Sequence, residues 1–299
     1  MSIKRILAPI PASISHHGGV QNGKIKVAAS AAKILNSHLE AVFIHEQTPE
    51  RSGRSLQAGG RIGGMGKSML EIRRQEIERQ EQCGREVHSL FVQACSANGV
   101  RVLEKNGGML NPPTASWHES TGSHMRVAMS RAPAFDMIIA SSALVAEPLR
   151  EIAEGALLQS GRPVLLAPSR MKRALADTAM IAWDESPECW HAVTASLPFL
   201  QQSRRVTIVS IDRKNGARQA SQEKVQAYLR CHNIDAKAKI IDPMSRPVGD
   251  AILATAGDEE ADLVVMGAYS RGRLREMMFG GATRHILNNA SATPVFLAH

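Results

Sequence analysis

The sequence contains two copies of one pattern, and this repeat limits the folds that the chain can adopt. Residues 135–140, Phe-Asp-Met-Ile-Ile-Ala, match residues 261–266, Ala-Asp-Leu-Val-Val-Met, and residues 162–166 match residues 293–297 in the same way. In each copy an apolar run follows an aspartate and a second apolar run follows a proline. A repeat of this kind indicates two equivalent structural units. With 299 residues the chain is long enough for two domains, each with its own core.

Short apolar runs alternate with amphipathic segments along both copies, which is typical of βαβ units. The alternation predicts an α/β protein with two tandem open parallel sheets of the Rossmann-like type and helices on both faces. Residues 168–177 are basic and polar and begin with a proline, as linkers do, so we place the domain boundary at residue 172, giving domains 1–172 and 173–299. The expected elements are strand 6–10, helix 26–35 and strand 39–44 in the first copy, and strand 179–183, helix 187–200 and strand 206–211 in the second.

Composition excludes several classes of protein. The net charge of +8 favours polyanions as partners, but aromatic residues make up only 4% of the chain, so no stacking surface for single-stranded nucleic acid is visible and we interpret the charge as a solvated surface. The four cysteines lack a CxxC or His-paired spacing, so we expect reduced thiols rather than a zinc site or disulfides. No apolar stretch reaches membrane-spanning length and no signal-peptide core is present, so a cytoplasmic location is expected, without membrane contact.

The first copy carries an additional segment at residues 51–68, rich in glycine and arginine, and a charged run from Glu71 to Glu86 that we expect to form an exposed helix. The segment ends Gly-Gly-Met-Gly-Lys-Ser, which is similar to a phosphate-binding P-loop. The P-loop pattern GxxxxGK[ST] requires a glycine at position 61, where Arg61 stands, and no strand leads into the segment. We therefore prefer a flexible insertion to a P-loop.

The segment with the clearest chemistry lies near the end of the second copy. An apolar run ends at Gly267, a basic loop follows, and Gly280 and Gly281 precede a further helix. Glycine at the end of a strand lets the backbone approach a ligand closely, and the first N–H groups of the next helix can donate to phosphate oxygens. In an open parallel sheet, ligands bind at this carboxyl end of the strands. The pattern predicts a phosphate-binding loop.

This segment resembles the nucleotide motif of the universal stress protein family, G-x-x-G-x9-G-[ST], and the two-copy layout resembles the tandem members of that family. Gly267 and Gly280 match the first and third glycines, whereas Ser270 stands at the second glycine and Gly281 at the Ser/Thr position; Ser270 and Thr283 leave hydroxyls nearby. The resemblance implies an adenine nucleotide alpha hydrolase-like fold. It also implies binding of ATP, ADP or AMP, with Mg²⁺ held largely by the phosphates.

The resemblance assigns further residues of the second copy to the nucleotide site. An aspartate at the end of the first strand contacts the base or ribose in this family, and Asp184 stands there; the alternative is a turn or helix N-cap residue before Pro187. Val209 and Ser210, near the end of the second strand, resemble residues that line the adenine pocket. Among the arginines of the loop, Arg271 is the first expected to pair with a phosphate.

The first copy lacks the corresponding residues. Pro11 stands where the second copy has Asp184, and Ser141 and Leu144 take the first two motif positions. Residues 146–154 are acidic and contain no glycine pair, so their carboxylates would repel a triphosphate. We therefore expect one nucleotide per chain, bound by the second copy.

These features predict a nucleotide-sensing regulatory or stress-response protein. No paired carboxylates, metal-binding cluster or activated nucleophile accompanies the motif, and we interpret His285 as a packed or surface histidine, so at most slow ATP hydrolysis is expected. The resemblance implies pairing through the last strand, residues 294–298, either between the two copies as an intrachain pseudo-dimer or between two chains as a homo-oligomer.

Two alternatives belong to other functional classes. The first is a scaffold or a metabolite- or lipid-binding module that no longer binds ATP, which the departures at Ser270 and Gly281 favour. The second is an enzyme of the wider nucleotide-binding α-hydrolase superfamily. Such an enzyme would need an SGGxDS-type loop after the first strand, and neither residues 12–13 nor residues 185–186 supply one.

Overall fold

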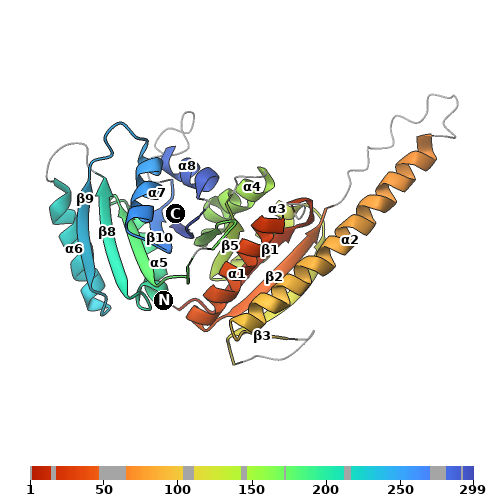
Figure 1. Ribbon diagram of the computed structural model, residues 1–299, viewed down its shortest axis with the longest axis horizontal. Helices are drawn as coiled ribbons and strands as arrows, with labels where there is room; N and C mark the ends of the chain where they lie inside the picture. The colour runs from red at the N-terminus through yellow and green to blue at the C-terminus, as the bar shows by residue number, and fades with distance from the viewer. Residues whose placement is uncertain are drawn as a thin grey trace.

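The chain folds into one mixed sheet covered by helices (Figure 1). A computed structural model describes residues 2–14, 18–46, 65–103, 111–142, 147–171, 173–211, 217–269, 281–290 and 292–299. Within these residues, 11 strands join into a single sheet, and nearly all of its strand pairings are parallel. The α/β class and the Rossmann-like sheet expected from the alternation of apolar runs and amphipathic segments are confirmed.

The strands of the first half are β1 (Arg5–Pro11), β2 (His38–His45), β3 (Arg101–Val102), β4 (Thr114–Thr121), β5 (Met137–Ser141) and β6 (Val164–Ala167). Those of the second half are β7 (Thr178–Trp183), β8 (Arg205–Ile211), β9 (Ala236–Ile241), β10 (Leu263–Gly267) and β11 (Val295–Ala298). Every strand predicted from an apolar run is present, with ends within one or two residues of the expected positions. The sequence did not predict β4, because its half-exposed, polar residues form no apolar run.

The helices are α1 (Gly18–Leu35), α2 (Met65–Ala97), α3 (His124–Arg131), α4 (Glu147–Gly155), α5 (Pro187–Leu200), α6 (Ala217–Cys231), α7 (Val248–Asp258) and α8 (Gly281–Asn289), with short helical turns η1 (Ala12–Ile14), η3 (Ala132–Ala134) and η4 (Ala156–Ser160). The predicted helix 187–200 is confirmed. The helix predicted at 26–35 begins earlier, because the buried polar residues Gln21 and Lys24 in its first turns interrupt the apolar pattern. In the part of the chain that the structure describes, none of the helices combines the length and apolar character of a membrane span.

Apart from the short additional edge strand β3, the two halves have the same strand order, and they meet at their last strands. The sheet runs β3-β4-β2-β1-β5-β6-β11-β10-β7-β8-β9, so β1 lies between β2 and β5 in the first half, as β7 lies between β8 and β10 in the second. Strand β11 pairs in parallel with β10 but antiparallel with β6, where Phe296 lies opposite Leu165. The sheet therefore continues from one half into the other within a single chain. Residue 172 lies outside the described residues, between the end of β6 and the start of β7, so the exact domain boundary stays a prediction.

The aspartate that marks the repeat has the same structural role in both halves. The Asp136 side chain accepts hydrogen bonds from the backbone N–H groups of Lys4 and Arg5, at 2.7 and 2.9 Å. In the second half, Asp262 accepts from the backbone N–H of Thr178 at 3.1 Å. The aspartate before β5 thus fixes the start of β1, and the aspartate before β10 fixes the start of β7, both at the amino end of the sheet.

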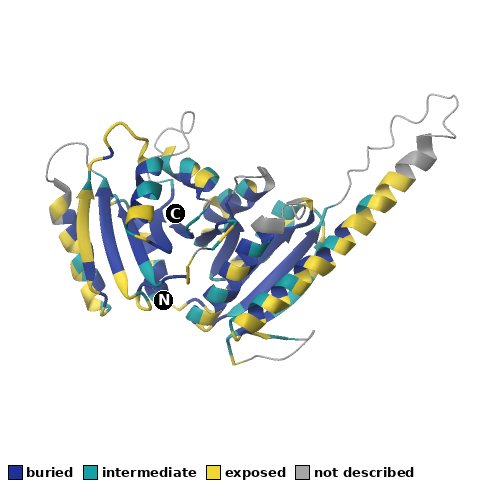
Figure 2. Cartoon of the chain, in the orientation of Figure 1, coloured by how far each residue is buried: buried dark blue, intermediate teal, exposed yellow. Residues whose placement is uncertain are grey.

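Helices cover both faces of the sheet, so its strands are buried on both sides (Figure 2). Alternate residues of a strand point to opposite faces, and Ile6 and Leu7 therefore belong to two different core clusters. The cluster that contains Ile6 packs against α1, α2, α5 and α6. The cluster that contains Leu7 packs against α3, α4, α7 and α8.

Helix α2 extends beyond the sheet, as Figure 1 shows. Its later residues Val87, Phe91 and Cys95 are buried, whereas residues 71–79 are exposed except for the half-buried Glu76. The exposed helix predicted for the charged run is confirmed. Residues 51–64, including Arg61 and most of the predicted insertion, lie outside the described residues.

Candidate functional site

The predicted site lies at the carboxyl ends of β7 and β10. The chain passes from β7 to β8 on one side and, after β9, returns to β10 on the other, so the space between β7 and β10 is the point where the strand order reverses. Ligands of open α/β sheets bind at such a point. Met266 lies opposite Ala182 in the parallel pairing, which brings Gly267 and Asp184 to the same edge. The fold thus brings together two of the predicted site residues that lie far apart in the sequence.

Asp184 supports the turn that leads into α5. Its Oδ1 accepts hydrogen bonds from the backbone N–H of Ser186 at 3.1 Å and from the Ser186 hydroxyl at 2.6 Å. The Ser186 Oγ is the N-cap of α5 and accepts from the backbone N–H of Cys189 at 3.1 Å. Between them, Glu185 has a positive φ of 70°. Asp184 thus has the turn role that was the alternative to a ligand contact, because Ser186 forms the N-cap and Asp184 orients it.

Gly267 allows close packing between β10 and α5. A Cβ atom at this position would lie 2.6 Å from the backbone nitrogen of Cys189 and 2.8 Å from the carbonyl carbon of Glu188. Because these atoms belong to the backbone of a helix, they cannot move aside as a flexible side chain can. The glycine is therefore required by the contact with the first turn of α5.

Val209 and Ser210 are buried in β8. Val209 belongs to the core cluster on one face of the sheet. The hydroxyl of Ser210 accepts a hydrogen bond, at 2.9 Å, from the Nε2 of Gln222, a residue of α6. The next residue, Ile211, ends the strand. Any contact of Val209 with an adenine ring would therefore involve the backbone at the end of β8 rather than its buried side chain.

The loop between β10 and α8 is fixed at both of its described ends. Thr283 is buried, and its hydroxyl accepts a hydrogen bond from the backbone N–H of Tyr269 at 3.1 Å. Gly281, the first residue of α8, is exposed, and a Cβ placed there would meet no atom of the described residues within 4 Å. Three predicted site residues between these ends, Ser270, Arg271 and Gly280, lie outside the described residues.

His285 on α8 packs against α7. A Cβ at Gly249 would overlap the His285 side chain, and the Nε2 of His285 lies 2.7 Å from a carboxylate oxygen of Asp250. This agrees with its interpretation as a packed histidine.

Tyr269 connects the start of the loop to the first half, a role that the sequence did not reveal. Its ring packs edge-on against His299 at a centroid distance of 6.3 Å, and the Nδ1 of His299 lies 3.0 Å from the carbonyl oxygen of Ala268. Burial raises the pKa of the Tyr269 hydroxyl, and the nearby carboxylate of Glu154 on α4 raises it further. The end of β10 is thus in contact with a helix of the other half.

At the corresponding edge of the first half, the protein's own side chains form a polar network. Glu46, which follows β2, accepts a hydrogen bond from the hydroxyl of Ser13. The His124 ring lies between two carboxylates, with Nδ1 3.7 Å from Glu46 and Nε2 3.1 Å from Glu151. Hydrogen bonding to Glu46 raises the pKa of His124, and the same bond lowers the pKa of Glu46. These residues join η1, β2, α3 and α4 beside the end of β1.

The helix after the first strand also differs between the halves. The fully buried amine of Lys24 donates to the carbonyl oxygen of Pro9, and burial lowers its pKa to about 7. The equivalent carbonyl of the second half belongs to Ala182, and the thiol of Cys189 donates to it at 3.4 Å. The equivalence follows from the pairings of β1 with β5 and of β7 with β10. A long side chain that ends in an amine therefore bonds to this carbonyl in the first half, and a small thiol does so in the second.

Two further polar side chains are buried at this edge of the first half. Ser141 stands at the position of Gly267, and its hydroxyl, like the amide group of Gln21, has no hydrogen-bond partner in the described part of the chain. Leu144, the other first-half motif position, lies outside the described residues. A serine side chain in the first half thus stands at the position where the second half has a glycine packed against the backbone of α5.

Among the described residues, no three His, Cys, Asp or Glu side chains cluster as metal ligands would. A hollow of about 670 Å³ lies at the opposite, amino ends of β7, β8 and β10. Its Arg204 is paired with Asp177 and its Arg173 with Glu260, so these charges are compensated within the hollow.

Known proteins resemble the chain in part of its sequence and in its whole fold. A model of the universal stress protein family matches residues 176–299. The structure of a universal stress protein from Archaeoglobus fulgidus DSM 4304 covers 99% of this chain and 96% of its own, with 15% identity and a TM-score of 0.65. A functionally unknown protein from Pseudomonas aeruginosa PAO1 covers 99% and 92%, with 13% identity and a TM-score of 0.52. No curated protein sequence matches the chain. At these identities, the two structures show a shared fold over the full length.

Proposed function

Since this chain belongs to the universal stress protein family through residues 176–299, we propose that it binds one adenine nucleotide in its second half and acts as a regulatory protein. The site comprises Asp184, Gly267, the loop with Ser270 and Arg271, and the first turn of α8. ATP, ADP and AMP share the adenosine group that this edge would recognise. The first half would serve as a structural partner.

The exposed start of α8, near the reversal point of the sheet, supports this proposal. Gly281 is exposed, and among the described residues no atom lies within 4 Å of its Cβ position, so no described side chain covers the first turn of α8 there. The first N–H groups of this helix and the helix dipole favour phosphate oxygens. The fold places them beside the carboxyl ends of β7 and β10, where a nucleotide could extend from Asp184 toward α8.

The residues of this edge suit binding better than turnover. The Oδ1 of Asp184 is occupied by Ser186, and burial raises the pKa of the Cys189 thiol to about 12, so neither group is an activated nucleophile or base. The described residues offer no ready-made metal cluster, so Mg²⁺ would arrive with the phosphates that coordinate it. Hydrolysis of ATP would be slow at most.

Tyr269 provides a route by which a bound nucleotide would affect the rest of the chain. A phosphate held by the loop would favour one arrangement of the segment between Tyr269 and Thr283. Because the Tyr269 side chain lies near Glu154 of α4, that arrangement would also act on the contact between the halves. A ligand shifts such an equilibrium only by its difference in affinity for the two arrangements.

A scaffold or metabolite-binding module remains the second candidate, and a specific observation favours it. The Thr283 hydroxyl, one of the groups expected to replace the missing Ser/Thr of the motif, is buried and already bonded to Tyr269. A nucleotide would therefore depend on backbone N–H groups and on residues of the loop. Mass spectrometry of small molecules that co-purify with the chain separates the two candidates, because a nucleotide supports the first and a lipid or other metabolite the second.

Calorimetry with the full chain tests nucleotide binding directly. We expect binding of ATP, ADP or AMP with Mg²⁺. The Gly281→Asp substitution should raise the dissociation constant for ATP at least about tenfold, because it places a carboxylate against the phosphates. Gly257→Asp is the matched control, because Gly257 is also exposed with no atom within 4 Å of its Cβ position and lies on α7. Absence of binding, or equal affinity in the Gly281→Asp variant, would contradict the proposal.

A further inference from the structure

Lys24 on α1 is a buried amine without a carboxylate partner. Of the lysine, arginine, aspartate and glutamate side chains that the structure describes, three are buried: Lys24, Glu40 and Asp262. Glu40 forms salt bridges to two arginines, and Asp262 accepts hydrogen bonds from a backbone N–H of β7. Among the described residues, Lys24 donates to one group, the carbonyl oxygen of Pro9. A buried charge is costly unless an opposite charge accompanies it.

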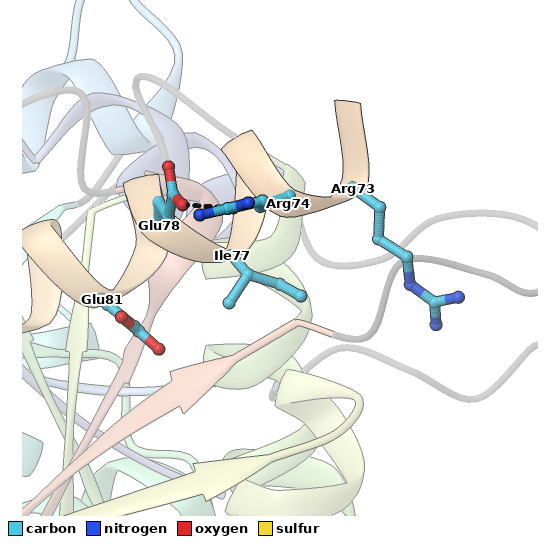
Figure 3. A pocket seen from close by; sticks show the side chains of 5 residues that line it. All are labelled: Arg73, Arg74, Ile77, Glu78 and Glu81. Carbon is cyan, nitrogen blue, oxygen red and sulfur yellow. Dashed lines mark hydrogen bonds and ion pairs between the residues drawn. The ribbon is translucent and has the colours of Figure 1, made fainter. Parts of the chain in front are cut away.

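The arginines in the hollows of the surface differ from Lys24, because carboxylates compensate them. Figure 3 shows a shallow hollow of about 410 Å³ beside α2, where Arg74 pairs with Glu78 at 2.8 Å. In the hollow at the amino ends of β7, β8 and β10, Arg173 pairs with Glu260 at 2.6 Å. Each hollow is lined by as many arginines as carboxylates, so neither has an excess charge that would select an ionic ligand.

The carbonyl that Lys24 contacts lies where β1 and β5 separate. The pairing of these two strands ends at Leu7, whereas the pairing of β7 with β10 continues to Ala182, the equivalent of Pro9. The carbonyl of Arg5 points to the β5 side, where it accepts from the backbone before β5, so the alternate carbonyl of Pro9 points to that side as well. Proline has no N–H group for the neighbouring strand. The ladder therefore stops there, and the amine of Lys24 takes its place.

Two further buried polar side chains lie at this separation. Met137 and Ile139 of β5 belong to the core cluster that packs against α1, so Ser141, the next residue on that face, also faces α1. Gln21 precedes Lys24 by one turn and lies on the same side of α1. Gln21 and Ser141 are at most 1% exposed, and neither the amide nor the hydroxyl has a hydrogen-bond partner among the described residues. Such groups require an explanation, because buried polar atoms are almost always bonded.

The chemistry of the three side chains suits a small anion. An ammonium group has three N–H donors, of which Lys24 uses one, and the hydroxyl of Ser141 and the amide of Gln21 add further donors. Burial lowers the pKa of Lys24 to about 7, and no carboxylate among the described residues offsets that effect. The two carboxylates of the first-half network contact His124 instead. Water would satisfy the donors, but only an anion would also compensate the charge.

We propose that Lys24, Gln21 and Ser141 form a buried site for one small monovalent anion, such as chloride or formate. The protonated amine supplies the compensating charge, and the amide and the hydroxyl donate to the anion. The anion holds the amine in its protonated form, so it binds together with a proton. This proposal is independent of the nucleotide site, because it uses no residue of the second half.

Urea unfolding of the full chain tests the site with chloride and formate as probes. Each probe replaces gluconate, an anion too large for a buried site, at constant ionic strength and near neutral pH. The urea midpoint of wild type should rise with the probe concentration, because a ligand that binds only the folded chain stabilises it. Lys24→Met should abolish this rise, and Lys26→Met, which removes an exposed lysine of the same helix, should keep it.

The two probes also distinguish the kind of anion. A rise with chloride alone indicates a spherical ion and a rise with formate alone indicates a carboxylate, and either supports the site. A wild-type midpoint that responds to neither probe, or a Lys24→Met variant that responds as wild type does, would overturn the proposal.

A second test uses the probe concentration that gives half of the midpoint rise. Ser141→Ala should raise this concentration at least about threefold, because one donor is lost. Ser196→Ala is the matched control, because it removes a buried hydroxyl of α5 and should leave the concentration unchanged. Since the anion binds with a proton, the wild-type concentration should also rise about tenfold per pH unit above the Lys24 pKa of about 7. A value that changes with neither Ser141→Ala nor pH would show that the anion binds elsewhere and would contradict the site.

Discussion

At the carboxyl edge of the sheet, the first half carries buried polar side chains, whereas the second half has a glycine at the end of β10 and an exposed glycine at the start of α8. Lys24 donates to the carbonyl of Pro9, as Cys189 does to the equivalent carbonyl of Ala182, and Ser141 stands at the position of Gly267. Pro11 ends β1 where Asp184 follows β7. Apart from the short edge strand β3, the strand order is the same in both halves. The two edges thus differ in side chains on one shared scaffold.

The two edges also differ in how tightly they are connected. In the first half, Ser13, Glu46, His124 and Glu151 link four elements by hydrogen bonds and ion pairs. In the second half, the N-cap interactions of Asp184 and Ser186 stay within one turn, and the bond between Tyr269 and Thr283 joins the two ends of a loop. Substitutions at equivalent positions can therefore test whether the first half exchanged binding for rigidity.

The largest effect is expected for Lys24→Met. The unfolded chain binds the Lys24 proton up to its ordinary pKa of 10.5, but the folded chain releases it above about 7. The folded pKa is depressed, so wild-type unfolding free energy should rise between these values, at up to about 1.4 kcal/mol per pH unit. Lys24→Met should remove this rise and stabilise the chain near neutral pH by about 3 kcal/mol.

Urea unfolding across this pH range measures the difference between wild type and the Lys24→Met variant. Lys26→Met is the control, because Lys26 is an exposed lysine on the same helix. If Lys24→Met and wild type showed the same dependence on pH, the amine would be charged in the folded protein, contrary to the prediction.

The next effect concerns the position where the halves carry Gly267 and Ser141. Gly267→Ala should lower the unfolding free energy by about 2–3 kcal/mol, because its Cβ would overlap the backbone of Cys189. Ser141→Ala should be neutral or stabilise the chain by about 1 kcal/mol, because the hydroxyl it removes is buried without a partner in the described residues. Urea midpoints of the two variants give the comparison, and similar values would show that the edges are packed alike.

A smaller effect is expected at the repeated aspartate of the second half. Burial raises the pKa of Asp262 from 3.8 to about 6. Because the raised pKa favours the protonated folded form, this group should lower wild-type stability as the pH rises through this interval. Asp262→Asn keeps an acceptor for the backbone N–H of Thr178. The unfolding free energy of the variant minus that of wild type should therefore be about 1 kcal/mol larger at neutral pH than near pH 4.

Urea unfolding at the two pH values checks the Asp262 prediction. Asp258→Asn, which removes an exposed carboxylate nearby, controls for net charge. If the difference in unfolding free energy between Asp262→Asn and wild type did not change with pH, the carboxylate would be well solvated, contrary to the prediction.

The smallest effect is expected for His124→Gln in the first-half network. The raised pKa of His124 means that its stabilising contribution is complete below the ordinary value of 6.5 and is lost as the pH rises through the folded value. The variant should be less stable by about 0.5 kcal/mol in mild acid and unchanged near pH 8, because the pair is partly exposed. An NMR titration of the His124 ring should give a pKa above 6.5 that falls in Glu46→Gln, and a value that does not respond to Glu46→Gln would show that the network is not formed.

Local patterns were sufficient to predict the strands that form apolar runs. Buried parallel strands are continuous apolar runs, so β1, β2, β7 and β8 could be located from the sequence. Helix α5 was predicted with its bounds, and Pro187 marks its start. Helix α3 and strand β4 were not predicted, because their polar and histidine-containing residues show no clear period. Helices α4, α6 and α7 and strands β3 and β9 were not predicted either.

The candidate site was only partly predictable. The sequence placed Asp184 and Gly267 at strand ends, and the fold brings these ends together. It could not show that Gly267 accommodates α5, or that Thr283 bonds to Tyr269, because both contacts depend on how helices pack on the sheet. The roles of Ser270, Arg271 and Gly280 remain predictions.

By itself, the sequence determined that this protein consists of two related α/β units, because repeats, apolar runs and helix starts are encoded in neighbouring residues. Only the tertiary structure decided that the units share one sheet through β6 and β11, and that Lys24 is buried. These features depend on strand register and on which helix face meets the sheet, and residues far apart in the chain set both.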